Sequence, residues 1–393
     1  MRSFVLAFLA AVIGYSAWNN NLYLLGLAVL FPLLWAKAAS RGAAGFVAFC
    51  YYAAAARGLV PGTQIFFGFF GPCVSMVLGF LFLVASSCIL AMPWFLVWTR
   101  DTSPTAMAWR LPAAIILVSV PPVAFVGWAN PISSAGVIFP GCRWYGLLAV
   151  VATMYLSLIL KRPSHVLVLL GLCTLSACLS PDTPLPPEGW KGVDTHFGGL
   201  SGQGDFLRFY DQNQHMIRTA MDSKDSVFLL FPEAVAGRWN QTTAALWEEP
   251  SVHLVNQGVT LLFGTEFPID EGVESERYDA VIVAVGSESG VLYRQRFPMP
   301  ISMWRPFSAR SARIHWLDPG VFILHGRRVA ALVCYEQVLT WPVLISMIHR
   351  PEIILAPANA WWSRNTSILG IQHTVLAAWG RLFPIPVITA FNY

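Results

Sequence analysis

The stretch Arg328-Val-Ala-Ala-Leu-Val-Cys-Tyr-Glu336 predicts a buried β-strand that ends in a thiol, an aromatic ring and a carboxylate. Cys334 is the only cysteine in the second half of the chain. The other six precede residue 180: Cys50, Cys73, Cys88, Cys142, Cys173 and Cys178. A lone cysteine is most often a small buried core residue. At a strand end beside a carboxylate, it is also suited to act as a nucleophile.

Similar short apolar runs recur through the second half and alternate with helical patterns. We expect strands over 226–231, 259–263, 280–285, 329–333, 352–356 and 386–390, and helices near 205–221, 241–257, 338–349 and 370–382. Strands that are apolar on both faces need cover on both sides of their sheets. The pattern therefore predicts a layered α/β domain.

The first half of the chain has a different composition. Residues 1–180 carry nine Lys or Arg and one acidic residue, Asp101, whereas the rest carries sixteen basic and twenty acidic residues. Apolar runs near the length that crosses a hydrocarbon core lie at 4–18, 22–36, 43–56, 73–98, 111–127, 145–160 and 165–180. We therefore expect a transmembrane domain of about seven spans over residues 1–180. The net charge of +4 lies beside these apolar runs and indicates no nucleic-acid partner.

The basic residues also predict an orientation, because Lys and Arg are retained on the cytoplasmic side. With the N-terminus inside, seven basic residues fall inside and only Arg57 and Arg143 fall outside. An odd number of spans then exports the second half, which would be periplasmic on a bacterial inner membrane. A Pro-rich connector over 181–195 separates the spans from a second domain over 196–393.

Three predicted strand ends carry polar residues. They are Phe231-Pro-Glu233, Tyr293-Arg-Gln-Arg296 and Cys334-Tyr-Glu336. A thiol is mostly protonated at neutral pH and needs a neighbouring base, which a carboxylate can provide. The oxyanion that forms after attack on a carbonyl needs a cation or strong donors.

Together these motifs resemble the apolipoprotein N-acyltransferases of the carbon-nitrogen hydrolase, or nitrilase, superfamily. The resemblance rests on Phe-Pro-Glu233, Tyr293, Val-Cys334-Tyr-Glu336 and Asn359-Ala-Trp361, with Trp128-Ala-Asn-Pro and Phe139-Pro-Gly141 in the first half. Within the superfamily, the two-part layout is most similar to plasmid-borne conjugal transfer proteins.

The resemblance implies a four-layer α-β-β-α domain with a Glu-Lys-Cys triad facing the outer leaflet. Cys334 would be the nucleophile, Glu233 the general base and Glu336 a supporting carboxylate. Tyr335 and Trp361 would contact substrate. A membrane lipid would donate the acyl group, and a lipoprotein or a protein of the conjugation apparatus would be the partner. No cofactor is implied, and the histidines show no metal-ligand spacing.

Several residues depart from the family pattern. Gln295 stands where the family has its lysine, Asn359 stands where it has an acid, and the final strands and closing membrane helix of the acyltransferases are absent. Because side chains alternate along a strand, Arg294 and Arg296 should face away from Gln295. A bulge would bring one of them to the substrate.

Two functions remain open at this point. One is a membrane-bound, Cys-dependent acyltransferase or amidase. The other is a catalytically weakened homologue that binds lipid or protein within a conjugation apparatus.

Overall fold

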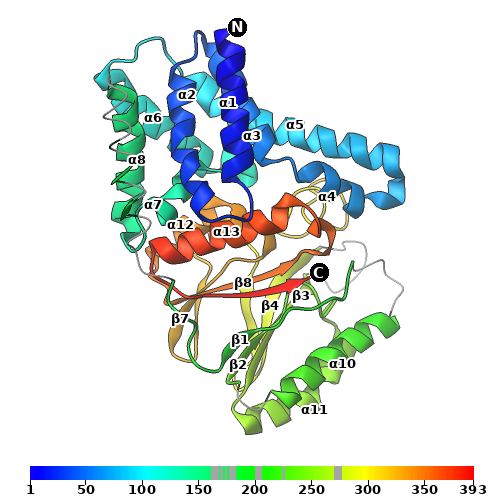
Figure 1. Ribbon diagram of the computed structural model, residues 1–393. Coiled ribbons are helices and arrows are strands. Elements are labelled where there is room, and N and C mark those ends of the chain that lie inside the picture. Colours follow the sequence, from blue (N-terminus) through cyan, green and yellow to red (C-terminus); the bar gives the residue numbers. More distant parts are fainter. Residues whose placement is uncertain are drawn as a thin grey trace. The chain divides into compact units, whose positions relative to one another are not determined.

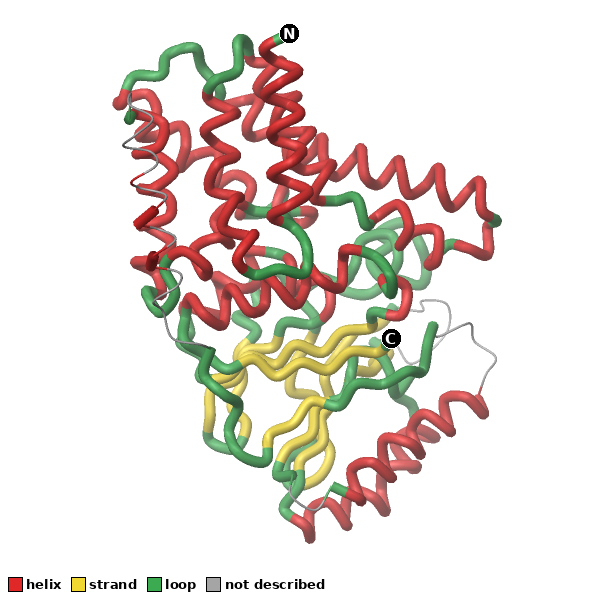
Figure 2. Tube along the Cα trace, viewed as in Figure 1, coloured by secondary structure: helices red, strands yellow, loops and turns green. Residues whose placement is uncertain are grey.

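The computed structural model describes residues 1–160, 168, 171–172, 175–176, 183–199, 206–223, 226–269 and 277–393. Its contacts divide the chain into two compact units. Unit 1 comprises Met1–Pro184, Val338–Trp341 and Ser363–Pro384, and unit 2 comprises Leu185–Gln337, Pro342–Trp362 and Ile385–Tyr393. Each unit is therefore built from segments that are distant in the sequence (Figures 1 and 2).

Unit 1 is helical. Its α-helices are α1 Arg2–Ala17, α2 Phe31–Ala36, α3 Arg41–Ala55, α4 Leu59–Phe66, α5 Pro72–Val97, α6 Pro104–Ser119, α7 Ala135–Ile138, α8 Arg143–Ile159 and α13 Ser367–Leu382. Short 3₁₀ turns join them: η1 Tyr23–Leu30, η2 Gly68–Phe70, η3 Val123–Val126 and η4 Pro131–Ser134. The late helix α13 contacts α7 and η4, so it belongs to this unit although it follows most of the strands.

The core of unit 1 is aromatic and hydrogen-bonded. The Phe31 ring stacks on Tyr51 with centroids 4.2 Å apart, and the indole N–H of Trp18 donates to the Tyr51 hydroxyl at 2.8 Å. Helices α1 and α3 approach closely at Gly14, where an added Cβ would lie 2.2 Å from the Tyr51 carbonyl oxygen. Close backbone approach at small residues is typical of helices that associate within membranes.

The described helices do not confirm the expected count of about seven membrane spans. Within the described residues, α5 alone is long and apolar enough to cross a membrane. The count rises to three if two bent pairs, α3 with α4 and η4–α7 with α8, each form one span. The axis bends by 50° between α3 and α4, at residues 56–58. The expected span at 165–180 lies largely outside the described residues.

Unit 2 contains two sheets. The five-stranded sheet has the order β1 Trp190–Gly192, β2 Phe228–Leu230, β3 Thr260–Pro268, β4 Tyr278–Gly286 and β5 Gly290–Arg294. The four-stranded sheet has the order β6 Val321–Leu324, β7 Arg327–Ala331, β8 Ile353–Asn359 and β9 Val387–Asn392. In the first sheet β1, β2 and β3 are parallel, and in the second β7, β8 and β9 are parallel.

Helices α10 Phe206–Asp222 and α11 Gln241–Gln257 lie beside each other along the five-stranded sheet (Figure 1). Their apolar residues, such as Met216, Trp247 and Leu254, share one buried cluster with Leu261 and Phe263 of β3. The central strands are buried along nearly their whole length, which explains why their sequences are apolar on both faces. Helix α12 Thr340–Ile348 follows the short turn η5 Cys334–Val338 after β7.

Candidate functional site

Glu233 is placed by the end of β2. The strand stops at Leu230, and Pro232 has no N–H with which to continue the ladder. The chain then runs along β3, where Gly264 donates its N–H to the Pro232 carbonyl at 3.0 Å. A Cβ on Gly264 would lie 2.5 Å from the Glu233 Cα. Only glycine therefore lets the Glu233 backbone lie this close to β3.

Cys334 is placed by a turn that follows β7. It begins the 3₁₀ turn η5 and has a positive φ of 49°, an uncommon conformation for a residue with a side chain. Leu332 still donates its N–H to Leu355 of β8 at 2.9 Å. The pairing with β8 therefore ends at Leu332, two residues before Cys334. Cys334 is buried but retains 7% exposure.

The Cys334 thiol and the Glu233 carboxylate meet across the two sheets. Burial raises the pKa of the Glu233 carboxyl to about 7, against the lowering effect of hydrogen bonds from Cys334 and the Asn359 N–H. Burial also raises the pKa of the Cys334 thiol well above its ordinary value, and the negative charge of Glu233 raises it further. The Asn359 N–H donates to Oε2 of Glu233 at 3.3 Å. Oε1 has no hydrogen-bond partner among the described residues, so it is available to receive a proton.

Gln295 is the third member of this group. It follows β5, is 1% exposed, and donates from its side-chain amide to the Val333 carbonyl at 3.3 Å. The amide is also near enough to Glu233 to lower the pKa of that carboxyl, although Oε1 of Glu233 receives no hydrogen bond of good geometry. The structure thus brings Gln295 together with Cys334 and Glu233.

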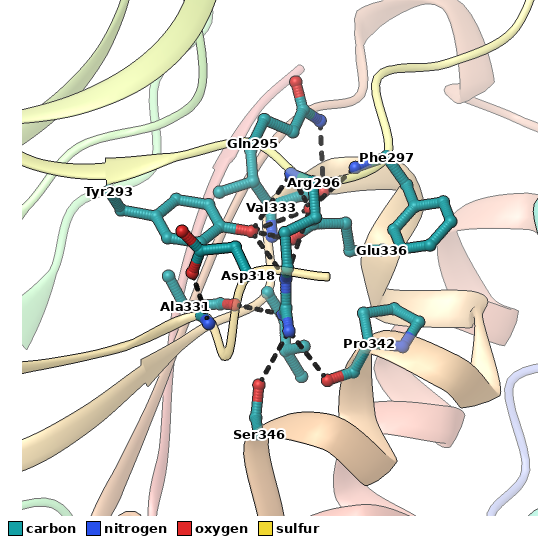
Figure 3. Close-up of polar contacts among 12 residues, drawn as sticks. Tyr293, Gln295, Arg296, Phe297, Asp318, Ala331, Val333, Glu336, Pro342 and Ser346 are labelled. Carbon is teal, nitrogen blue, oxygen red and sulfur yellow. Dashed lines mark hydrogen bonds and ion pairs between the residues drawn. The ribbon is translucent and has the colours of Figure 1, made fainter. Parts of the chain in front are cut away.

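Arg296 points to the opposite side of the chain from Gln295 (Figure 3). Its guanidinium is fully buried and donates to the carbonyls of Ala331 and Pro342 at 3.0 Å each, and to the Ser346 hydroxyl at 3.0 Å. It lies 3.8 Å from the Glu336 carboxylate. These contacts satisfy the charge within the protein, and they hold α12 against the end of β7.

Glu336 joins the two loops that carry Gln295 and Cys334. Its carboxylate accepts the backbone N–H of Arg296 at 2.6 Å and that of Val333 at 2.9 Å, and it also accepts the Tyr293 hydroxyl (Figure 3). Glu336 is completely buried. Glu336 thus accepts hydrogen bonds from the residue after Gln295 and from the residue before Cys334. These two bonds hold the loop of Gln295 beside the loop of Cys334.

Arg294 lies away from this group. Its side chain is 55% exposed and pairs with Asp279 at 3.4 Å, next to Arg313 and His315. The pairing of β4 with β5 does shift in register between Ile282 and Val283. The shift precedes Tyr293, and it leaves both arginines directed away from Glu233.

Asn392 was not singled out by the sequence, yet it supports the site from β9. Its Oδ1 accepts from the Thr195 hydroxyl at 3.0 Å and the Phe197 N–H at 2.8 Å, while its Nδ2 donates to the Asn359 side chain at 2.8 Å and the Gly198 carbonyl at 3.0 Å. All four hydrogen-bonding positions of this buried amide are used. The signal in the sequence was a polar residue in the apolar run Val-Ile-Thr-Ala-Phe-Asn392.

Tyr335 and Trp361 flank the site in sequence. The Tyr335 side chain is half-buried next to Cys334, and its backbone N–H lowers the pKa of the thiol. Trp361 begins the 3₁₀ turn η6 Trp361–Ser363 after β8. Its indole lies against Gly199, where an added Cβ would be 3.0 Å from the ring. Among the described residues, no three His, Cys, Asp or Glu side chains gather in a way that would hold a metal ion.

Two curated relatives match this chain over its full length. One is the conjugal transfer protein TraB of Agrobacterium fabrum, 35% identical over all of this chain and 93% of the relative. The other is the probable conjugal transfer protein TraB of Sinorhizobium fredii, 32% identical over 99% of this chain and 97% of the relative. The chain belongs to the TraB family of conjugal transfer proteins.

The Carbon-nitrogen hydrolase family also matches, over residues 273–381. This TraB-family chain therefore carries the nitrilase-type domain expected from its motifs, and the match includes Gln295, Cys334 and Glu336 but not Glu233. Similar solved structures include an amidase of the nitrilase superfamily from Nesterenkonia AN1, with 14% identity, a TM-score of 0.33, and coverage of 45% of this chain and 67% of that one. A carbon-nitrogen hydrolase from Helicobacter pylori G27 has 14% identity and a TM-score of 0.36, covering 51% and 73%.

Proposed function

We propose that this TraB-family protein is a membrane-bound, Cys-dependent acyltransferase or amidase that acts in plasmid conjugal transfer. The observation that carries the proposal is the meeting of the Cys334 thiol with the Glu233 carboxylate. A carboxyl with a pKa of about 7 is close to the operating pH, which is where a general base works best.

The proposed reaction has two steps. The thiol gives its proton to the Glu233 carboxylate while sulfur attacks an acyl carbonyl, and the tetrahedral oxyanion takes hydrogen bonds from nearby N–H groups. Collapse forms a thioester, and Glu233 returns the proton to the departing alcohol or amine. An incoming amine or water then attacks the thioester, passes its proton through Glu233, and releases the thiol and the acylated product.

We propose that the acyl donor is a membrane lipid, and that the acceptor is a lipoprotein or a protein of the conjugation apparatus. Helix α5 supports membrane association because it is long and apolar enough to span a bilayer. The excess of basic residues among the apolar runs supports a multi-pass inner-membrane protein with unit 2 in the periplasm.

A second candidate is a catalytically weakened homologue that binds lipid or protein. Gln295 favours the second candidate, because a neutral amide stands where the acyltransferases that the sequence resembles have a lysine beside the thiol. The pKa of Cys334 is raised well above its ordinary value, mainly by burial, so the thiolate is scarce at neutral pH. Loss of one oxyanion donor slows a well-studied hydrolase by roughly 10²–10³-fold.

Covalent labelling separates the two candidates. The full-length protein in detergent is treated with an alkyl phosphonate probe that mimics the tetrahedral adduct, and the modified residue is located by mass spectrometry. We expect an adduct on Cys334 that is lost in Cys334→Ser and Glu233→Gln but kept in Cys142→Ser, which removes an exposed thiol of unit 1. If the folded protein forms no Cys334-dependent adduct, the acyltransferase or amidase role is excluded and the binding role remains. Plasmid transfer frequency with Cys334→Ser then tests whether the thiol is needed in conjugation.

A further inference from the structure

A cavity of about 340 Å³ is lined only by residues of unit 1. It is formed where several helices begin or end: Arg2 starts α1, Lys37 follows α2, and Trp98 and Arg100 follow α5. Its remaining lining is largely apolar and includes Met107 of α6. Its volume is at the lower end of the range for small-molecule pockets.

Three cations line this cavity: Arg2, Lys37 and Arg100. None of them forms an ion pair with an acidic side chain of the described residues. Asp101 is the one acidic residue before position 181, and its carboxylate accepts the backbone N–H of Ser103 at 2.9 Å. No carboxylate of the described residues therefore pairs with the positive charge around the cavity.

Trp98 provides an independent sign of a missing ligand. It lines the same cavity and is only 5% exposed, so its ring is nearly fully buried. Its indole N–H has no hydrogen-bond partner among the residues that the structure describes. Two other buried indoles of the unit are satisfied, since Trp35 donates to the Trp94 carbonyl and Trp94 donates to the Tyr52 hydroxyl, whereas the Trp379 N–H of α13 also has no partner among the described residues. A buried donor left unpaired costs about 1–3 kcal/mol, so an acceptor is expected at this position.

We propose that this cavity binds a phosphate group, with Arg2, Lys37 and Arg100 supplying the charge and the unpaired Trp98 N–H supplying a hydrogen-bond donor. Phosphate offers several strong acceptor oxygens and a negative charge, which match cations and an unpaired N–H. The site takes either the phosphate of an anionic phospholipid or a free phosphate anion. It goes beyond the acyl-transfer function proposed above and needs neither Cys334 nor Glu233. In the orientation proposed above, it would lie at the cytoplasmic end.

The experiment uses the full-length protein, delipidated in detergent. In one arm, phosphatidylglycerol is titrated and bound lipid is counted by native mass spectrometry. In the other arm, binding of radiolabelled inorganic phosphate is measured by equilibrium dialysis. The variants are Arg100→Gln, which removes one cation, and Trp98→Phe, which keeps the aromatic ring but removes the donor. Arg41→Gln is the matched control, because Arg41 is an exposed cation of the same unit that does not line the cavity.

We expect one tightly held phosphate group per protein. Arg100→Gln should weaken its binding roughly fivefold, the equivalent of about 1 kcal/mol for one cation near an anionic group. Trp98→Phe should weaken it about tenfold through loss of a hydrogen bond to a charged acceptor, while Arg41→Gln should leave it within twofold. Saturation by lipid alone identifies a headgroup, and saturation by inorganic phosphate identifies a free anion.

Two results would overturn the proposal. The first is a protein that melts as the wild type does but binds neither probe. The second is an equal loss of binding in Arg41→Gln and Arg100→Gln with no loss in Trp98→Phe, which would show that the basic residues act only as a diffuse charge or as a topology signal.

Discussion

The Glu233 carboxylate accepts a hydrogen bond from the backbone N–H of Asn359, and so joins the two sheets of unit 2 at the proposed site. Glu233 follows β2 of the five-stranded sheet, and Asn359 ends β8 of the four-stranded sheet. The contact uses Oε2 and leaves Oε1 without a partner among the described residues. Oε2 of this carboxylate thus holds the two sheets together, while Oε1 accepts no hydrogen bond from the described residues.

The burial of Glu233 predicts a pH-dependent cost to stability. The pKa of this carboxyl is about 7 in the folded protein and near 4.5 when unfolded. Between these values the folded state binds more protons than the unfolded state, so the free energy of unfolding falls as the pH rises. The full difference between the two pKa values corresponds to about 3 kcal/mol in the free energy of unfolding. Glu233→Gln removes this titration. We therefore expect the variant to gain stability over the wild type as pH rises from about 5 to about 7.5.

Denaturant unfolding of the full-length protein at the two pH values measures this gain. Glu288→Gln is a suitable control, because it replaces another carboxylate of unit 2 that is only half-buried. A stability difference between Glu233→Gln and wild type that stays constant across the range would contradict the raised pKa.

The neutral side chain at position 295 predicts a gain of function. Gln295→Lys would place a cation beside Glu233 and Cys334, where it would lower the pKa of both groups and stabilise an oxyanion. We expect phosphonate labelling of Cys334 to become at least about tenfold faster. Gln295→Met, which has a similar length and no donor, should label more slowly than the wild type. If Gln295→Lys folds normally but labels no faster, a missing cation does not limit the reaction.

The central strands of unit 2 could be predicted from the sequence, whereas three of its four edge strands were missed. Every expected strand overlaps an observed one, because central strands buried on both faces are apolar throughout. The expected strand ranges omit β1, β5 and β6, although 293–296 was expected to be a strand end, and each of these three strands lies at the edge of its sheet. Their residues are largely partly buried or exposed, so they leave no continuous apolar run.

The reactive residues of the site could be predicted from the sequence, but the hydrogen bonds that hold them in place could not. Cys334, Glu233 and Gln295 were found at strand ends, and parallel strands bring such ends to one edge. The partners of Asn392 are distant in the sequence, since Thr195 is 197 positions away. Local patterns carry no information on such contacts. For the same reason, the helical pattern at 370–382 predicted α13 but not its place in unit 1.

Two neighbouring arginines should differ sharply in their contribution to stability. Arg296→Met leaves the completely buried Glu336 carboxylate without its cation, and breaking a buried pair in this way costs about 3–5 kcal/mol. Arg294→Gln removes a half-exposed partner of Asp279, for which about 0–1 kcal/mol is expected. Denaturant unfolding of both variants measures the difference. Arg296→Met combined with Glu336→Gln should recover part of the loss, and equal costs for the two single variants would contradict the assigned burial.

Asn392 should act as a positioning residue for the proposed base. Asn392→Ala leaves four buried or partly buried polar groups without this partner, including the Asn359 side chain, and should cost about 3 kcal/mol of stability. It should also loosen Asn359, whose N–H lowers the pKa of Glu233. The pKa of Glu233 would then rise further, so the pH at which Cys334 labelling becomes half-maximal should move upward.

The matched control for this last effect is Asn240→Ala. Asn240 caps α11 through a hydrogen bond to Thr243 N–H at 2.9 Å, and its loss should cost about 1 kcal/mol without reaching the site. Both variants are destabilised, but only Asn392→Ala should shift the pH profile of labelling. A profile with the same midpoint in wild type, Asn240→Ala and Asn392→Ala would mean that Asn392 stabilises unit 2 without tuning Glu233.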